Sequence, residues 1–119
     1  MEVHQISFAK IAVINSYLAE VTVNNGVDID IDMVDEIHKA LMSLLGHTFS
    51  LLINKSNAYS TQLDALIKFG SLPAIDKIAV FAPNKLAQMS ADFSATIPSS
   101  QALNIQVFTE REEAMNWLL

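Results

Sequence analysis

The chain of 119 residues contains no cysteine, so disulfides, thiolate metal ligands and cysteine nucleophiles are all excluded. Glycine and proline number only three each while 51% of the residues are hydrophobic, a composition that excludes a collagen-like or disordered chain. No apolar run approaches the length of a transmembrane helix. The first residues carry an acid and a histidine where a signal peptide has a basic stretch and a long apolar run. We therefore expect a soluble cytoplasmic protein with no transmembrane segment.

Basic side chains are also few. Seven lysines and arginines stand against thirteen aspartates and glutamates, and the formal net charge is −6. Phosphate binding needs a concentrated basic surface, so this balance argues against a nucleic-acid partner. A chain of this length has room for one real core but not for two. No repeat, low-complexity tract or linker interrupts it, and we expect a single domain over residues 1–119.

Signals for strands and helices alternate along the chain. Two β-rich runs, 6–14 and 18–23, are separated by turn residues and can pair only as an antiparallel hairpin. The elements expected after this hairpin are a helix over 32–45, a strand over 49–54, a helix between Thr61 and Gly70, a strand over 77–82, a helix that follows Pro83 and Asn84, a strand over 104–108 and a helix that ends at Leu119. The predicted order is therefore ββαβαβαβα.

Residues with capping chemistry mark the ends of these helices. Asp32 is the predicted N-cap of the first helix, and Gly46 fits the left-handed position just past its end. Ser60 and Thr61 are the predicted cap of the second helix. The stretch 109–112, Thr-Glu-Arg-Glu, is the pattern of a capping box before the last helix.

The order predicts an α/β fold, a single-layer, mixed, mostly parallel five-stranded sheet flanked by four helices. Strands separated by helices must be parallel, and their crossovers are right-handed. The runs 51–53 and 78–81 do not alternate with polar residues, so both faces of the central sheet should be covered. If the helices pack mainly on one face, Leu52, Phe81 and Phe108 face outward and need a partner. We therefore favour a homo-oligomer, most simply a two-fold homodimer.

Three features carry a resemblance to a known family. They are the order of the elements, the Ser/Thr-capped helix after the strand 51–54, and the ending 107–114 with Trp117 and Leu118 after it. Together they resemble the SpoIIAA-like branch of the STAS superfamily. The resemblance covers almost the whole chain and implies a sheet whose strands follow roughly in chain order, flanked by helices.

The resemblance also implies a non-enzymatic regulatory module that works by protein–protein contact. In anti-sigma-factor antagonists of the superfamily, a partner kinase phosphorylates a Ser or Thr at the junction between the third strand and the helix that follows it. The motif there is close to Asp-Ser-Ser-Gly. The corresponding residues here are Tyr59, Ser60, Thr61 and Gln62. The two hydroxyls match the motif, while its preceding acid and following glycine are absent.

We expect the contact surface to be the loop 55–61 with the start of the following helix. The candidate phospho-acceptor or interaction residues are Ser60, Thr61, Ser56, Lys55 and Tyr59. The structural alternative is that one hydroxyl simply caps the helix and that Ser56 is an ordinary turn former. Phosphorylation at a helix N-terminus would be electrostatically tolerated and would remodel a docking surface.

No pattern of a metal, cofactor or catalytic site survives inspection. The acidic run 28–32 imitates the start of a calcium-binding loop, but the sixth and twelfth positions hold Met33 and Lys39 in place of Gly and Glu. The turns after the strands lack a Gly-rich phosphate loop, and no Gly-x-Ser-x-Gly elbow occurs. The histidines have no second ligand at a metal-binding spacing; they are His4, His38 and His47. We predict no catalytic residue, no metal and no cofactor.

A second reading comes from a different class of function, the binding of a small apolar ligand or lipid. Relatives of this fold are linked by resemblance to lipid-carrier domains, and the Met- and Phe-rich helix 86–93 could line an apolar pocket. The interaction module predicts an exposed apolar patch and no deep cavity. The ligand binder predicts a large apolar pocket.

Overall fold

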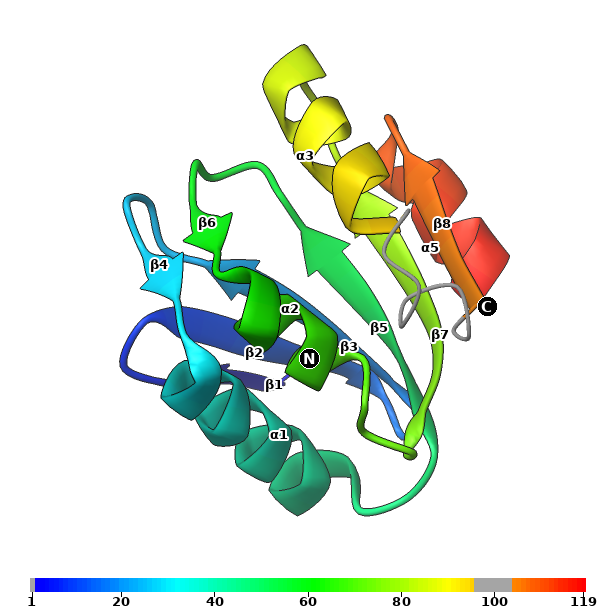
Figure 1. Ribbon diagram of the computed structural model, residues 1–119. Helices are drawn as coiled ribbons and strands as arrows, with labels where there is room; N and C mark the ends of the chain where they lie inside the picture. The colour runs from blue at the N-terminus through cyan, green and yellow to red at the C-terminus, as the bar shows by residue number, and fades with distance from the viewer. Residues whose placement is uncertain (1, 96–103) are drawn as a thin grey trace.

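The computed structural model describes residues 2–95 and 104–119, and its main feature is a six-stranded sheet with helices on both faces (Figure 1). The strands of this sheet are β1 (Glu2–Gln5), β2 (Ala9–Asn15), β3 (Leu18–Val23), β5 (Phe49–Asn54), β7 (Ile75–Phe81) and β8 (Asn104–Phe108). The helices in the described part are α1 (Ile31–Leu45), α2 (Leu63–Phe69), α3 (Lys85–Ala95) and α5 (Arg111–Leu118). Two short strands pair with each other as a separate ribbon, β4 (Asp28–Ile29) and β6 (Ser60–Thr61). None of these described helices is both long and apolar enough to cross a membrane.

The order of the strands in the large sheet is β1-β2-β3-β5-β7-β8, which follows the chain. The first three strands pair antiparallel, and the pairings from β3 to β8 are parallel. The α/β class, the mixed sheet and the four helices predicted from the sequence are confirmed within the described residues. The prediction of five strands is wrong, because β1 adds a strand at the antiparallel edge and makes the sheet more evenly mixed. The residues of β1 are mostly exposed, so the sequence of this strand lacks the apolar pattern by which the other strands were predicted.

Helices α1, α2 and α3 lie on one face of the sheet, and α5 lies on the other (Figure 1). Successive parallel connections that advance in one direction with the same hand place their helices on one face. Within the described residues α5 follows β8 and does not lead to another strand of this sheet, so this constraint does not apply to α5. It buries Leu52 fully, and Phe81 and Phe108 pack against the same cluster beside Ala114 and Leu118. The prediction that both faces of the sheet are covered is therefore confirmed, and the alternative in which Leu52, Phe81 and Phe108 face outward does not hold.

Helix α1 covers the core with one apolar stripe. The buried residues of the stripe are Val34, Ile37, Leu41 and Leu45. The N-cap is Asp30, whose Oδ1 accepts a hydrogen bond from the Met33 amide at 2.9 Å. The prediction of Asp32 as the cap is wrong by half a turn. Gly46 ends the helix with φ of 73°, which confirms the left-handed position predicted for it.

The helix starts at α2 and α5 also differ from the prediction. The N-cap of α2 is Gln62, which makes no side-chain capping hydrogen bond. Ser60 and Thr61 lie in β6, so the prediction that they cap the helix is wrong. The N-cap of α5 is Glu110, again without a side-chain hydrogen bond, so the capping box expected from Thr109 does not form.

Candidate functional site

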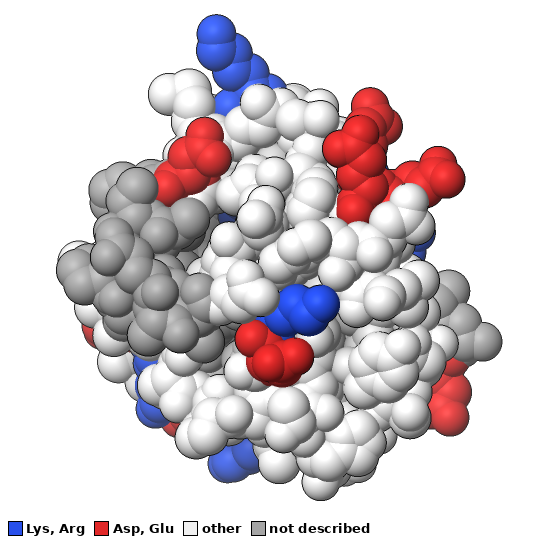
Figure 2. All heavy atoms as spheres, turned by 90° about the vertical axis from the view of Figure 1, so that its right-hand side faces the viewer, with Lys and Arg blue, Asp and Glu red and all other residues white. Residues whose placement is uncertain are grey.

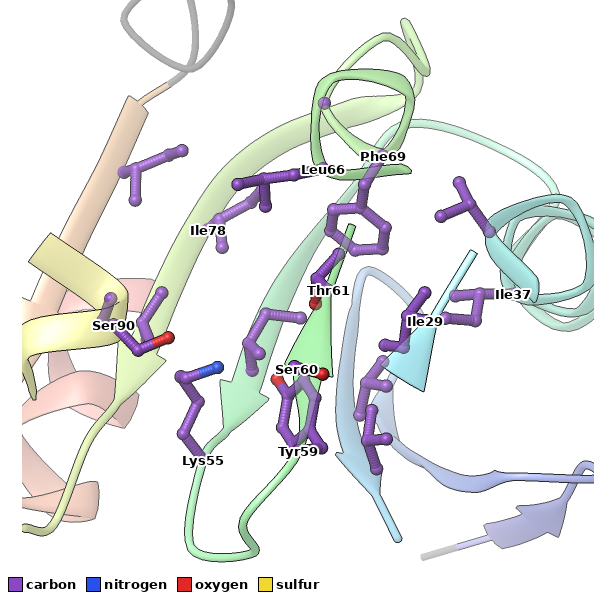
Figure 3. Close-up of a pocket in the computed structure, with 18 of the residues that line it drawn as sticks. Ile29, Ile37, Lys55, Tyr59, Ser60, Thr61, Leu66, Phe69, Ile78 and Ser90 are labelled. Atoms are coloured by element: carbon purple, nitrogen blue, oxygen red, sulfur yellow. The ribbon is translucent and has the colours of Figure 1, made fainter. Parts of the chain in front are cut away.

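A cavity of about 340 Å³ lies between the sheet and helices α2 and α3, on the face that also carries α1 (Figure 3). Strands β3, β5, β7 and β8 contribute side chains to it, as do the three helices and the β4–β6 ribbon. Its apolar lining comprises Val21, Val23, Ile29, Val34, Ile37, Ile53, Leu63, Leu66, Phe69, Ile78, Val80, Ala91 and Ile105, with Gly70. Its polar lining comprises Lys55, Tyr59, Ser60, Thr61 and Ser90. A mostly apolar cavity with a few polar groups is the usual form of a small-molecule site.

The polar groups of the cavity come mainly from the chain that leaves β5. Lys55 directly follows the last residue of that strand, and Tyr59, Ser60 and Thr61 lie further along the same connection. Because β5 is parallel to both of its neighbours, this connection starts at the carboxyl edge of the parallel strands. Ligands of open α/β sheets bind outside that edge. The cavity therefore has its polar end where this class of fold places ligand contacts.

Lys55 is partly buried, and its Nζ lies 4.0 Å from the centroid of the Tyr59 ring. Figure 3 shows its nitrogen directed toward the middle of the pocket, between Ser90 and Tyr59. None of the ion pairs among residues 2–95 and 104–119 involves Lys55. Burial lowers the pKa of its ammonium below the ordinary value, because the charged form loses water. The face of an aromatic ring offsets part of that loss.

The Tyr59 phenol is the second polar group at this end of the cavity. Burial raises the pKa of the phenol well above its ordinary value, so the hydroxyl stays protonated and can donate. In the described part of the chain no protein group makes a hydrogen bond with this hydroxyl. A buried tyrosine hydroxyl normally has a partner. The phenol is therefore available to a ligand in the cavity.

Ser60 belongs to the β4–β6 ribbon. Its Oγ donates to Asp28 Oδ1 at 2.8 Å, and Gln62 Nε2 donates to Asp28 Oδ2 at 3.1 Å. The hydrogen bonds from Gln62 and Ser60 lower the pKa of the Asp28 carboxyl. The side chains of Asp28 and Ser60 thus link the two short strands that form one wall of the cavity.

The structure brings together four of the five residues proposed from the sequence. Lys55, Tyr59, Ser60 and Thr61 all line the cavity. Ser56 does not; it is exposed, and its amide donates to Asn54 Oδ1 at 2.9 Å in a local turn. The sequence predicted these residues as a protein-contact loop, and their position in a cavity was not foreseen.

Helix α2, which closes one side of the cavity, is tied to α1 by polar contacts. Nε2 of His38 lies 3.0 Å from the carbonyl oxygen of Phe69, and Lys68 Nζ lies 2.9 Å from Asp35 Oδ1. The carbonyl can only accept, so Nε2 carries the proton. Burial lowers the pKa of the His38 imidazole, and the hydrogen bond to Phe69 only partly opposes this. Both side chains of the ion pair are substantially exposed, so its contribution to stability is small.

Helix α3 contributes less to the cavity than its sequence suggests. Ser90 and Ala91 line the cavity, whereas Leu86 and Met89 are 74% and 62% exposed. The helix 86–93 therefore lines an apolar pocket, as the second reading of the sequence expected, but through Ser90 and Ala91 and not through Leu86 and Met89. The side chain of Phe93, which also lies in that range, is outside the described residues.

A second polar cluster, missed in the sequence, lies on the opposite face of the sheet. Glu20 in the middle of β3 is buried and accepts hydrogen bonds from Arg111 and from Asn54 Nδ2, the latter at 2.9 Å. Burial works to raise the pKa of Glu20, but the hydrogen bonds from Arg111 and Asn54 outweigh it and lower the pKa. The signal in the sequence is a lone charged residue within an otherwise β-forming run.

Charged and metal-binding groups are dispersed over the described residues. No group of three or more His, Asp or Glu side chains in that part of the chain could hold a metal ion. Figure 2 shows the side of the molecule that carries α5 and β8, where lysine and arginine side chains stand apart from one another on a mainly uncharged surface. This face offers no continuous basic patch for a phosphate backbone.

Comparisons with known proteins agree with this fold. The model of the SpoIIAA-like family matches residues 18–119. The crystal structure of an uncharacterised protein from Shewanella loihica PV-4, of the DUF3478 family with a SpoIIAA-like fold, is similar with a TM-score of 0.61 at 14% sequence identity. The alignment covers 99% of this chain and 91% of that one. The chain has no significant match among curated proteins.

Proposed function

The chain belongs to the SpoIIAA-like family, and from that premise we propose that it is a non-enzymatic binding domain for a small apolar ligand. The observation that carries the proposal is the cavity of about 340 Å³ between the sheet, α2 and α3. Its lining is apolar apart from one lysine and four hydroxyl side chains. Small-molecule sites span about 300–1,000 Å³, and a surface that only contacts another protein needs no such cavity.

The chemistry of the lining supports binding rather than catalysis. Among the described residues that line the cavity there is no His, Asp or Glu, the side chains that most often move protons in enzymes. The Tyr59 phenol is held in its neutral form by burial. The Ser60 hydroxyl donates to the Asp28 carboxylate, but the hydrogen bonds from Gln62 and Ser60 lower the pKa of that carboxyl, which makes it a weak base for activating a nucleophile. The cavity is therefore equipped to enclose and orient a ligand.

The first test blocks the cavity. Ala91 is buried and lines it, so Ala91→Phe is expected to fill the space from α3. Titration calorimetry with 1-decanol should show binding to the unmodified protein and a loss of at least about tenfold in affinity for the variant. Met89→Phe introduces the same ring at an exposed position of the same helix and should bind normally. Thermal unfolding of both variants checks that the fold persists.

Native mass spectrometry of gently purified protein gives an independent test. A ligand that copurifies should appear as added mass on the unmodified protein and be absent from Ala91→Phe. Failure of 1-decanol to bind the unmodified protein, together with clean native spectra, would refute the proposal.

The second candidate is the protein-interaction module predicted from the sequence. Apolar side chains exposed on the two helices beside the cavity favour it: Leu63, Ile67, Leu86 and Met89. The partner is unknown, and the homodimer, the cytoplasmic location and a switch at Ser60 or Thr61 stay predictions.

If α3 forms the dimer contact, Leu86→Ser with Met89→Ser should convert a dimer to a monomer in native mass spectra. A monomeric unmodified protein would count against this dimer.

A further inference from the structure

We propose that the ligand of the cavity is a single-chain monocarboxylate, with its carboxylate at Lys55 and its hydrocarbon tail against β7 and α2. This inference rests on the proposed function and names the class of ligand for the same site. Its starting point is the position of one lysine in an otherwise uncharged cavity.

Lys55 is the only charged residue among the described residues that line the cavity. The whole chain carries thirteen acidic residues, yet none in the described part pairs with this lysine. The carboxylate of the β4–β6 ribbon, Asp28, is already engaged by Ser60 and Gln62. A partly buried cation without an anion is unfavourable in a folded protein. An anionic ligand would supply the missing charge.

The donors at this end of the cavity fit a carboxylate. The Lys55 ammonium and the Tyr59 phenol both lack a hydrogen-bonding protein partner among the described residues, and Nζ stands 4.0 Å from the Tyr59 ring centroid. Ionised carboxylates accept such hydrogen bonds strongly. The single cation matches one negative charge. A phosphate monoester, with about two charges at neutral pH, would keep about one negative charge unneutralised beside apolar walls.

The rest of the cavity fits one hydrocarbon chain. Ile78 and Val80 of β7 form one side of the lining, and Leu66 and Phe69 of α2 form another. Figure 3 shows the labelled side chains of α2 and β7 on the far side of the pocket from Lys55. A volume of about 340 Å³ is near the small end of the range for ligand sites, which favours a single medium-length chain over a two-chain lipid.

The test compares decanoate with 1-decanol, which share a tail and differ in the head group. Titration calorimetry at neutral pH should show decanoate binding to the unmodified protein at least about tenfold more tightly than 1-decanol. Lys55→Met should abolish this preference and keep 1-decanol binding within about twofold, since the apolar walls remain. Lys55→Arg, which keeps the charge, should retain a preference for decanoate. Lys85→Met removes an exposed lysine from α3 and should behave like the unmodified protein.

The outcomes separate the two proposals. Equal affinity for decanoate and 1-decanol in the unmodified protein, or an undiminished preference in a folded Lys55→Met, overturns the carboxylate inference and leaves an apolar site. Binding of neither compound overturns the proposed function, and this inference with it. Thermal unfolding shows that each lysine variant is folded before its affinity is compared.

Discussion

Arg111, the first residue of α5, reaches across to Glu20 in the middle of β3. Its Nη2 lies 2.5 Å from Glu20 Oε1, and its Nε lies 3.2 Å from Oε2. The Glu20 side chain is nearly buried while the Arg111 side chain is 44% exposed. This bidentate pair joins the antiparallel part of the sheet to the helix that covers the parallel part.

Removal of the arginine leaves a buried carboxylate with fewer partners, so Arg111→Met should destabilise the fold. We expect a loss of about 1–3 kcal/mol in the free energy of unfolding, less than for a fully buried pair because the arginine is partly exposed. Urea denaturation at neutral pH measures it. The double variant Glu20→Met, Arg111→Met should recover part of the loss, because no unpaired charge remains. A single and a double variant of equal stability would contradict this account.

We expect His38 to make the stability of the fold depend on pH near neutrality. Burial lowers the pKa of its imidazole below the ordinary 6.5, so in the folded state it resists protonation. At pH values between the folded-state pKa of His38 and 6.5, the unfolded chain binds more protons than the folded protein. The free energy of unfolding therefore rises with pH in this range. The free energy of unfolding should be greatest above pH 6.5 and fall as the pH drops through 6.5 toward the folded-state pKa.

Urea denaturation at a series of pH values measures this dependence. His38→Gln cannot titrate and should flatten the slope in that window. His47→Gln, at an exposed position, is the matched control and should keep it. An identical slope in His38→Gln and the unmodified protein would remove His38 as the cause.

Substitution of Gly46 tests the left-handed backbone conformation that ends α1. Its φ is 73°, and a Cβ built there would meet only the Met42 carbonyl oxygen, at an ordinary contact distance of 3.8 Å. The strain of Gly46→Ala therefore comes from the backbone and not from crowding. We expect a loss of about 1 kcal/mol in the free energy of unfolding. Ser43→Ala, at an exposed position inside the same helix, should be neutral or slightly stabilising.

The order of the elements could be predicted because long apolar runs dominate it. Phe49–Asn54 is a continuous β-forming run, and the structure has a strand over the same residues. The strands that escaped prediction are short or exposed: Glu2–Gln5 shows a mostly exposed pattern, and Asp28–Ile29 has only two residues. The cap of α1 was misplaced because Asp30 and Asp32 have the same chemistry, and only the end of β4 decides between them.

The cavity could not be predicted, because its apolar walls use the same residue types as a core. Val80 and Leu66 come from different elements, and their separation depends on where α2 settles over the sheet. The residues at the polar end of the cavity could be identified from the sequence. The sequence predicts Lys55 and Tyr59 as part of an interaction loop, but nothing in it shows that the Lys55 ammonium lies over the Tyr59 ring.

A negative charge added at Ser60 would act on the β4–β6 ribbon, which forms one wall of the cavity. Its hydroxyl donates to Asp28 at 2.8 Å, and its backbone amide donates to the Val27 carbonyl oxygen at 2.9 Å in the same ribbon. Ser60→Asp replaces the donor with a carboxylate beside a carboxylate, so the pairing of β4 with β6 should weaken. We expect amide hydrogen exchange at residue 60 and at Gln62 to accelerate by about two- to fivefold, as for like charges opposed in a sheet.

Two variants separate charge from the loss of a hydrogen bond in this ribbon. Ser60→Ala removes the hydroxyl without adding charge and should show the smaller acceleration. Ser56→Asp adds the same charge at an exposed position of the same connection, outside β6, and should leave exchange in the ribbon unchanged. Equal exchange in Ser60→Asp and Ser60→Ala would mean that charge at this position does not loosen the wall. A phosphate on Ser60 would then have no electrostatic route to the cavity through Asp28, whereas a selective acceleration would give the predicted switch a physical basis.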